Sequence, residues 1–534
     1  MSKYVLVTSG VCSGLGKGVA AASLGSLFEC SGRSVAMIKC DPYINVDAGT
    51  ISPYQYGEVY VTEDGAETDS DLGVFSRFTT GRLTSDNCIT IGKVYNQVIQ
   101  NERAGRYNGR TVQVIPHITD EIKRRILFVA AQTAADIVIV EIGGTVGDME
   151  SVPYLEAARQ LIREFDRHDI VSVHLTLVPA ITGGELKSKP TQHSVKQLQE
   201  VGIRPDILLC RTERQLDGAM RKKIALFCNV SSDAVFTSPD IHESIYELPV
   251  VLHRSGIDSL ILKRLELPSE RCLIRPWTSF LNKFAAPRKK IRIGMVGKKD
   301  NLDDCYKSVC EALLHAAVTD YQVALELKKI DAETIESTND VKPFFSDVDG
   351  IIVPGSSGQR GFLGLLAAVK YAREHAIPYM GIDLGMQLMA VETARSLCGW
   401  SDADSTEFMQ TEHAIISLPE EQAWLTSPGL MKLGASTVQL VKGTKLANLY
   451  KKHEINERHR NKYIFDRRYT DDMAACGLVV CASSTIDGSV EAFEWSGHPW
   501  GIGVQYHPEF NSRPARPHPF FSAFIGAVLG EQKD

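Results

Sequence analysis

The 534-residue sequence lacks the features that mark several large classes of protein. No apolar run reaches the roughly 20 residues that a membrane-spanning helix needs, and there is no internal repeat or low-complexity tract. The net charge is −7 at pH 7, so any basic site must be local, and a general nucleic-acid binder is not expected. These absences predict a cytoplasmic protein that binds neither membranes nor nucleic acid.

Cysteine is present but follows no ligand pattern. The twelve cysteines are scattered, none forms a C-x-x-C pair, and pairs such as Cys305 and Cys310 match no common zinc spacing. Free thiols in a reducing cytosol are therefore expected.

What is present is ordinary globular composition arranged as alternating strands and helices. Residues 135–140, 170–178 and 206–211 are apolar, rich in β-branched residues and separated by helical patterns. This alternation predicts a parallel sheet covered on both faces, with ligands at the carboxyl ends of the strands. We predict an α/β fold of two doubly wound, mostly parallel-sheet domains: a P-loop-like domain over residues 1–267, a linker over 268–290 and a flavodoxin-like domain over 291–534.

The first strand, residues 4–8, leads into a glycine-rich loop, a lysine and an Ala-rich helix. Glycines let backbone N–H groups approach an anion, and the helix N-terminus adds partial positive charge. Gly18 stands where a standard phosphate loop has the magnesium-binding Ser or Thr. A strand–helix turn can carry glycine for steric reasons alone, but Lys17 at the helix start favours phosphate binding.

Charged residues follow other strands of this half. Lys39 ends the predicted strand 34–39, Glu141 follows the predicted strand 135–140, and Arg211 ends the predicted strand 206–211. A kinase-like site needs carboxylates that hold magnesium near the phosphate loop, and Asp71 and Glu141 are the candidates. The alternatives are a solvated loop acid for Asp71 and surface lysines for Lys17 and Lys39.

Longer strings identify a family. DPYINVD at 41–47, GEVYVTEDGAETD at 57–69, TVQVIPH at 111–117, EIGGTVGD at 141–148 and KSKPTQHS at 187–194 resemble the synthase domain of CTP synthases. The resemblance implies that ATP phosphorylates the 4-oxygen of UTP and that ammonia then displaces the phosphate. It also implies Mg²⁺, a homotetramer with nucleotide sites between subunits, and GTP as a candidate effector.

The resemblance also assigns residues in this half. Lys17 and Lys39 are catalytic, and Asp71 and Glu141 hold the metal. ATP is bound by Gly14, Leu15, Gly16, Lys17, Gly18, Val19 and Asp71. UTP is bound by Ser13, Asp148, Met149, Glu150, Lys187, Ser188, Lys189, Pro190, Thr191, Gln192 and Lys223.

Two positions in this half depart from the family. Tyr56 replaces a histidine in a region that borders the family's ammonia passage, and the run Val74–Arg77 lacks the usual acid. A larger tyrosine would narrow the ammonia passage, so the transfer of ammonia from one domain to the other is not assured by the resemblance.

The second half resembles a class I glutamine amidotransferase whose nucleophile is missing. Asp383 stands in the Gly-x-Cys-x-Gly elbow where the cysteine is expected, although His507 and Glu509 of the His-Pro-Glu string are present. Ser356 replaces a glycine of the oxyanion turn and Lys462 replaces an arginine that clamps glutamine. Glu407 still matches a glutamine-contacting position, and no cysteine near Asp383 in the sequence substitutes for the missing one.

A carboxylate cannot replace this thiolate in amide hydrolysis. The tetrahedral adduct would expel the carboxylate more easily than the amine and return to the starting amide, whereas a thiolate forms a stable thioester. The leading hypothesis is therefore a CTP synthase-type ligase that uses free ammonia. The alternatives are a paralogue that uses another amine or a modified pyrimidine nucleotide, and a non-catalytic nucleotide-binding regulatory subunit.

Overall fold

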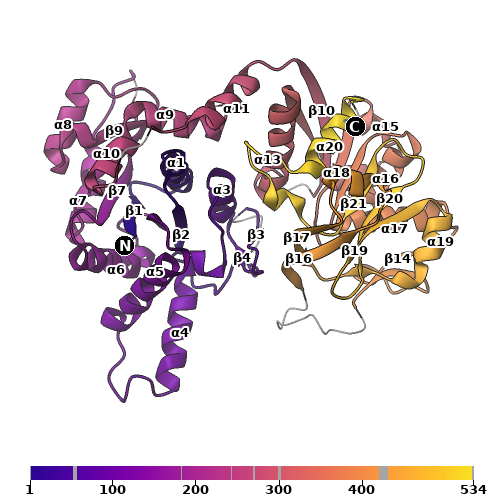
Figure 1. Cartoon of the computed structure of the whole chain (residues 1–534), viewed down its shortest axis with the longest axis horizontal. Helices are drawn as coiled ribbons and strands as arrows, with labels where there is room; N and C mark the ends of the chain where they lie inside the picture. The colour runs from indigo at the N-terminus through magenta and orange to yellow at the C-terminus, as the bar shows by residue number, and fades with distance from the viewer. Residues whose placement is uncertain are drawn as a thin grey trace. The chain divides into compact units, whose positions relative to one another are not determined.

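A computed structural model describes residues 2–51, 57–181, 183–241, 243–268, 271–298, 302–338, 340–419 and 431–531. The chain forms two compact units (Figure 1). The first unit comprises Met1–Ile51 and Thr68–Leu281, and the second comprises Ser52–Glu67 and Asn282–Asp534.

Within its described residues, the first unit is built on a seven-stranded sheet of order β5-β2-β6-β1-β7-β8-β9, in which every pairing is parallel. The strands are β1 (Lys3–Ser9), β2 (Val35–Asp41), β5 (Cys88–Thr90), β6 (Ile137–Ile142), β7 (Ile170–Leu177), β8 (Ile207–Thr212) and β9 (Val235–Pro239). The central strands are almost wholly buried, as expected for a parallel sheet covered on both faces.

Helices pack on this sheet, among them α1, which follows the glycine-rich loop. Helix α1 packs against β1, β2 and β6 and against α3, α9 and α10. It is buried on most sides, and its alanines allow this close approach. The α-helices are α1 (Lys17–Cys30), α3 (Ser70–Phe78), α4 (Ile91–Arg103), α5 (Thr119–Thr133), α6 (Val152–Glu164), α7 (Lys189–Glu200), α8 (Gly218–Cys228), α9 (Leu248–Ser255), α10 (Ile257–Arg264) and α11 (Arg275–Ala285). Short turns of other helix types are η1 (Ser85–Asn87), η2 (Val114–Ile118), η3 (Met149–Ser151), η4 (Ser232–Ala234) and η5 (Ile245–Glu247).

The second unit contains, in its described residues, a nine-stranded sheet of order β11-β10-β12-β13-β21-β20-β19-β16-β17. The pairings from β11 to β21 are parallel, and those from β21 to β17 are antiparallel. The strands are β10 (Lys289–Gly297), β11 (Val323–Asp331), β12 (Gly350–Val353), β13 (Tyr379–Ile382), β16 (Lys432–Leu440), β17 (Glu454–Asn461), β19 (Leu478–Ser484), β20 (Val490–Trp495) and β21 (Gly501–Val504). Shorter pairings involve β3 (Tyr60–Val61), β4 (Glu67–Thr68), β14 (Asp404–Ser405), β15 (Ala414–Ser417) and β18 (Ile464–Phe465).

Helices again surround the parallel part, with separate apolar clusters built on each of its faces. The α-helices are α12 (Leu302–Cys305), α13 (Lys307–Ala316), α14 (Ala332–Glu336), α15 (Lys342–Phe345), α16 (Phe362–Glu374), α17 (Leu384–Ser396), α18 (Lys445–Tyr450), α19 (Thr470–Ala475) and α20 (Pro519–Val528). The remaining turns are η6 (Ala317–Tyr321), η7 (Arg467–Tyr469) and η8 (Pro508–Asn511).

The predicted α/β class is confirmed, but the chain is divided differently from the expectation. The segment expected to be a linker contains α11, whose Trp277 stacks on Phe78 of the first unit with ring centroids 5.2 Å apart. Residues 52–67, expected in the first domain, belong to the second unit, where Arg458 donates to the Tyr60 hydroxyl.

The expectation of free thiols throughout is also wrong. Cys398 and Cys476 are joined by a disulfide across 78 residues of sequence, and the other ten cysteines lie outside this disulfide. No helix among the described residues combines the length and the apolar character needed to cross a bilayer.

Candidate functional site

The glycine-rich loop connects β1 to α1 and has the backbone geometry of an anion cradle. Val11, Gly14 and Gly16 all have left-handed backbones, with φ between 75° and 81°. Gly16 is the N-cap of α1 and has no side chain with which to cap it. The first N–H groups of this helix can therefore bind a phosphate oxygen.

Two lysines and two carboxylates meet beside this loop. The parallel register places Lys39 of β2 directly opposite Glu141 of β6. The Lys39 Nζ lies 2.7 Å from Glu141 Oε2 and also contacts the Asp71 carboxylate. The Lys17 Nζ lies 3.2 Å from Glu141 Oε1 and donates to the carbonyl of Gly144 at 2.8 Å. The structure thus brings together Lys17, Lys39, Asp71 and Glu141.

Gly18 has a steric reason to lack a side chain. A Cβ built on Gly18 would lie 2.5 Å from Asp71 Oδ1. The Asp71 carboxylate therefore occupies the space beside the first turn of α1. This gives a steric reason for the departure from a standard phosphate loop, because a Ser or Thr side chain at position 18 would collide with the Asp71 carboxylate of α3.

The charges of this cluster shift one another's pKa values. Burial alone would lower the pKa of Lys39, but Asp71, Glu141 and Asp41 together raise it well above its usual value. Burial raises the pKa of Asp41 to about 6, against the opposing effect of Lys39. Burial would also raise the pKa of Asp71, but Lys39 and Lys17 lower it below the usual value. Asp71 therefore stays ionised at neutral pH, as a metal ligand requires.

The carboxylates fit a hard divalent cation. Glu141 is completely buried, and within the described part of the chain neither of its oxygens has a hydrogen-bond partner, so only the two lysine charges compensate it. Carboxylate oxygens beside a phosphate loop are hard ligands of the kind that Mg²⁺ binds.

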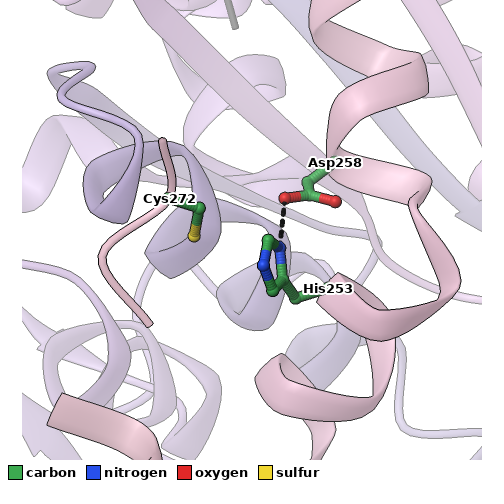
Figure 2. A group of neighbouring side chains, drawn as sticks. All are labelled: His253, Asp258 and Cys272. Atoms are coloured by element: carbon green, nitrogen blue, oxygen red, sulfur yellow. Dashed lines mark hydrogen bonds and ion pairs between the residues drawn. The ribbon is translucent and has the colours of Figure 1, made fainter. Parts of the chain in front are cut away.

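Another group of metal-ligand types lies elsewhere in this unit and consists of His253, Asp258 and Cys272 (Figure 2). Asp258 of α10 bonds the His253 Nδ1 of α9 at 2.8 Å. The backbone of Leu273, the next residue after Cys272, bonds to Cys30 at the C-terminal end of α1. The phosphate loop is at the other end of this helix, about 20 Å away at 1.5 Å per residue. This group is therefore not part of the lysine–carboxylate site.

The residues expected to bind UTP lie on the loops after β1, β6 and β7 and on η3, α7 and α8. Lys187 pairs with Glu185 at 2.6 Å, and the positive charge of Lys223 also acts on Glu185. Thr191 and Ser188 are buried and bond within the fold, Thr191 to the Leu177 carbonyl at 2.9 Å. The exposed members of the set are Ser13, Asp148, Met149, Glu150, Lys189 and Lys223.

Some residues at this site were not singled out from the sequence. Asp41, at the end of β2, lies 3.6 Å from Lys39 Nζ, and the pKa of Asp69 is raised well above its usual value by burial and by Asp41. Arg211, noted only as a strand end, is held by Asp240 at 2.7 Å and approaches the Gly14 carbonyl. The strand-end position was the available signal for Asp41, whereas Asp69 and Asp240 carried none.

The second unit holds a separate site at the turn between β13 and α17. Asp383 occupies that turn with φ 51° and ψ −107°, the strained conformation of a strand-to-helix elbow. Its Oδ1 accepts a hydrogen bond from Gln505 Nε2 at 2.6 Å. Burial raises the pKa of Asp383 to about 6, Glu407 adds to the shift, and His507 opposes it.

A His–Glu pair lies beside this elbow. His507 Nδ1 is 2.8 Å from Glu509 Oε1, both residues are buried, and the charges of Glu509 and Asp383 raise the pKa of His507 against the effect of burial. Asp383 thus stands beside an intact His–Glu pair.

A cavity of about 450 Å³ opens at Asp383. The other second-half residues singled out from the sequence, Ser356, Glu407 and Lys462, line it together with His507 and Glu509. Glu407 accepts from the Gly358 N–H at 2.7 Å, and the Lys462 ammonium lies 5.6 Å from the Tyr463 ring centroid.

Two residues that line this cavity were not predicted from the sequence. Glu58 lines it, because residues 57–67 belong to this unit, and accepts from the Ser308 N–H at 3.0 Å. Cys305 of α12 lines it as well, so a cysteine does share the cavity with Asp383, although it is not on the elbow. Tyr56 lies outside the described residues.

Comparison with known proteins agrees with both halves of this arrangement. Residues 3–267 match the family model "CTP synthase N-terminus", and residues 301–527 match "Glutamine amidotransferase class-I". The chain is 48% identical to a CTP synthase of Caldanaerobacter subterraneus over 99% of its own length and 98% of that protein's. It is 49% identical to a CTP synthase of Geobacter sulfurreducens over 100% and 99% of the two lengths.

Among solved structures, a glutaminase domain of a Trypanosoma brucei CTPS with bound acivicin is 34% identical over 46% of this chain and 96% of that one, with a TM-score of 0.43. Both halves of the sequence, and its full length, match proteins of one kind. The chain belongs to the CTP synthase family.

Proposed function

We propose that this protein is an ATP-dependent ligase that converts UTP to CTP with free ammonia as the nitrogen donor. The observation that carries the proposal is the cluster of Lys17, Lys39, Asp71 and Glu141 beside the phosphate loop. Relatives that cover the whole chain at nearly half identity are CTP synthases. An intact cluster of this kind argues against the alternative of a purely regulatory subunit.

The first step transfers the γ-phosphoryl group of ATP to the 4-oxygen of the uracil ring. The loop N–H groups and Lys17 bind the phosphates, and Lys39 offsets the negative charge that moves towards the acceptor oxygen. Asp71 and Glu141 would hold Mg²⁺, which supplies further charge neutralisation at the phosphates when bound. Gly14, Leu15, Gly16, Gly18 and Val19 complete the ATP-binding segment.

The second step forms the C–N bond. Phosphorylation makes the 4-oxygen a good leaving group, so ammonia adds to the ring carbon and phosphate departs with the C–O electron pair. The products are CTP, ADP and phosphate, and the proton that ammonia loses passes to solvent.

UTP is assigned to the loops and helices that carry its expected ligands. Lys187, Lys189 and Lys223 would neutralise the triphosphate, and Glu150 would bind a ribose hydroxyl. Ser13, Asp148, Met149, Ser188, Pro190, Thr191 and Gln192 complete the set. The family resemblance also leads us to propose a homotetramer in which a neighbouring subunit completes the site, with GTP as the candidate effector.

The proposed donor follows from the chemistry of Asp383. A carboxylate at the elbow gives no stable acyl intermediate with an amide, so the family's glutamine hydrolysis is not expected. Ser356 in the oxyanion turn and Lys462 in the place of a bidentate arginine support the same conclusion.

The test is CTP formation by the purified full-length protein with ATP, Mg²⁺, UTP and ammonium chloride, followed by chromatography. CTP that requires all four components supports the proposal. ATP consumption without CTP, or amination of another pyrimidine nucleotide in preference to UTP, would replace it with the specialised-paralogue alternative.

A further inference from the structure

We propose that the cavity at Asp383 binds a small primary ammonium cation, which is ammonium itself in the reaction proposed above. The inference rests on the proposed use of ammonia and gives the altered elbow a role in recruiting the nitrogen donor. The evidence for it is three buried acceptor groups that line the cavity, and the lack of a lysine or arginine paired with Asp383.

The acceptors belong to Asp383, His507 and Glu509. Within the described residues, His507 Nε2 and Glu509 Oε2 are buried and have no hydrogen-bond partner. Asp383 Oδ1 accepts a hydrogen bond from Gln505, and Asp383 Oδ2 lies near Gly355. Buried polar atoms without partners are uncommon in folded proteins and call for a ligand that supplies donors.

Asp383 and His507 lie close to each other beside Gly355, in the lining of the cavity. The position of a Cβ built on Gly355 is 3.2 Å from Asp383 Oδ2 and 3.1 Å from His507 Cε1, so both side chains border one point. No hydrogen bond or ion pair links Asp383 to His507 in the described structure. A cation with several N–H donors can donate one hydrogen bond to Asp383 and another to neutral His507. A ligand that has only acceptors cannot do this.

Two of the three lysine and arginine side chains that line the cavity bond to other groups, and the third, Lys462, lies 5.6 Å from the Tyr463 ring centroid. Lys298 donates to the carbonyls of Ser357 and Gly358, the latter at 2.6 Å. Arg460 pairs with Glu67 at 2.8 Å. No lysine or arginine among the described residues forms an ion pair with the Asp383 carboxylate, so with His507 neutral a bound cation would offset the cost of its burial.

The arrangement also provides a route from ammonium to ammonia. One N–H bond of the bound cation breaks, the proton moves to His507 Nε2, and the electron pair stays on nitrogen as the lone pair of ammonia. Glu509 bonds His507 Nδ1–H and stabilises the imidazolium that forms. His507 then returns the proton to solvent.

The test compares ammonium dependence in the wild type and in Asp383→Asn at fixed pH. The variant keeps an oxygen for Gln505 but removes the charge. We expect the KM for ammonium to rise about tenfold, with kcat at saturating ammonium and the KM for UTP within twofold of the wild type. Asp471→Asn, which removes an exposed carboxylate from the same unit, is the matched control and leaves all three values unchanged.

A binding measurement keeps the inference separate from catalysis. Ammonium chloride and methylammonium chloride should raise the Tm of the wild type more than tetramethylammonium chloride at equal ionic strength, because the last has no N–H donor. The difference should vanish in Asp383→Asn. If that variant does not fold, Asp383→Ala removes the same charge.

The outcomes separate the two proposals. CTP formation from ammonium with the same ammonium KM and the same Tm response in wild type and Asp383→Asn would overturn the cation site and leave the proposed function standing. An Asp383-dependent Tm response in a protein that makes no CTP would support the cation site and refute the proposed function.

Discussion

Gly18→Ala should separate activity from stability at the phosphate loop. Ordinary contact with a Cβ begins at about 3.4 Å, and the new methyl group would lie 2.5 Å from Asp71 Oδ1, so the carboxylate must move by about 1 Å. A displacement of this size at a catalytic group costs about 100-fold in rate, or about 2.7 kcal/mol of transition-state stabilisation. Alanine is the better helix former by up to about 1 kcal/mol, which opposes the cost of moving the carboxylate, so the free energy of unfolding should change little.

The assay is kcat/KM for UTP with saturating ammonium, alongside the Tm of each protein. Gly218→Ala is the control, since it makes the same change in the first turn of α8, where a Cβ meets no atom within 4 Å. The control should keep its activity. Full activity in Gly18→Ala would show that the position of Asp71 does not matter, and a large fall in its Tm would show that the loss is structural.

Three further predictions concern other residues. Lys17→Ala and Asp71→Ala should each abolish UTP-dependent phosphate release, measured with ammonium present; near-full turnover in either would refute the site assignment. UTP should raise the Tm, because it binds only the folded state, and Lys187→Ala should reduce that rise; an unchanged rise would remove Lys187 from the site. The raised pKa of Asp383, about 6 against 3.8, means that ionisation destabilises the fold as pH rises between these values. Asp383→Asn should therefore have a higher free energy of unfolding than the wild type at pH 7, by up to about 3 kcal/mol, and an equal one below pH 4. Urea denaturation of both proteins at the two pH values measures this difference. A difference that does not change with pH would contradict the prediction.

The fold class and the centre of the first site could be predicted because their signals are local. A strand, a glycine loop and a lysine at a helix start are consecutive in sequence, and Lys39 and Glu141 end strands that a parallel sheet brings to one edge. The registered pairing of Lys39 with Glu141 follows from that topology. Asp71 was selected by resemblance, and only the structure explains why Gly18 accompanies it.

What could not be predicted depends on contacts between distant parts of the chain. Nothing local indicates that residues 57–67 leave the first unit, because the Tyr60 contact with Arg458 spans 398 positions. The same holds for Cys305, which lines the cavity at Asp383 from a different helix. The Cys398–Cys476 disulfide also has no spacing signal, since its two halves are 78 residues apart.

The most direct test of the account is the identity of the nitrogen donor. The unmodified protein is supplied with ATP, Mg²⁺, UTP and GTP, together with either ¹⁵N-ammonium or amide-¹⁵N glutamine, and both CTP and glutamate are measured. The account predicts ¹⁵N-labelled CTP from ammonium, and neither CTP nor glutamate above the no-donor control from glutamine. Stoichiometric glutamate and labelled CTP from glutamine alone would contradict it, and would mean that Asp383 or another group of the cavity supports amide hydrolysis.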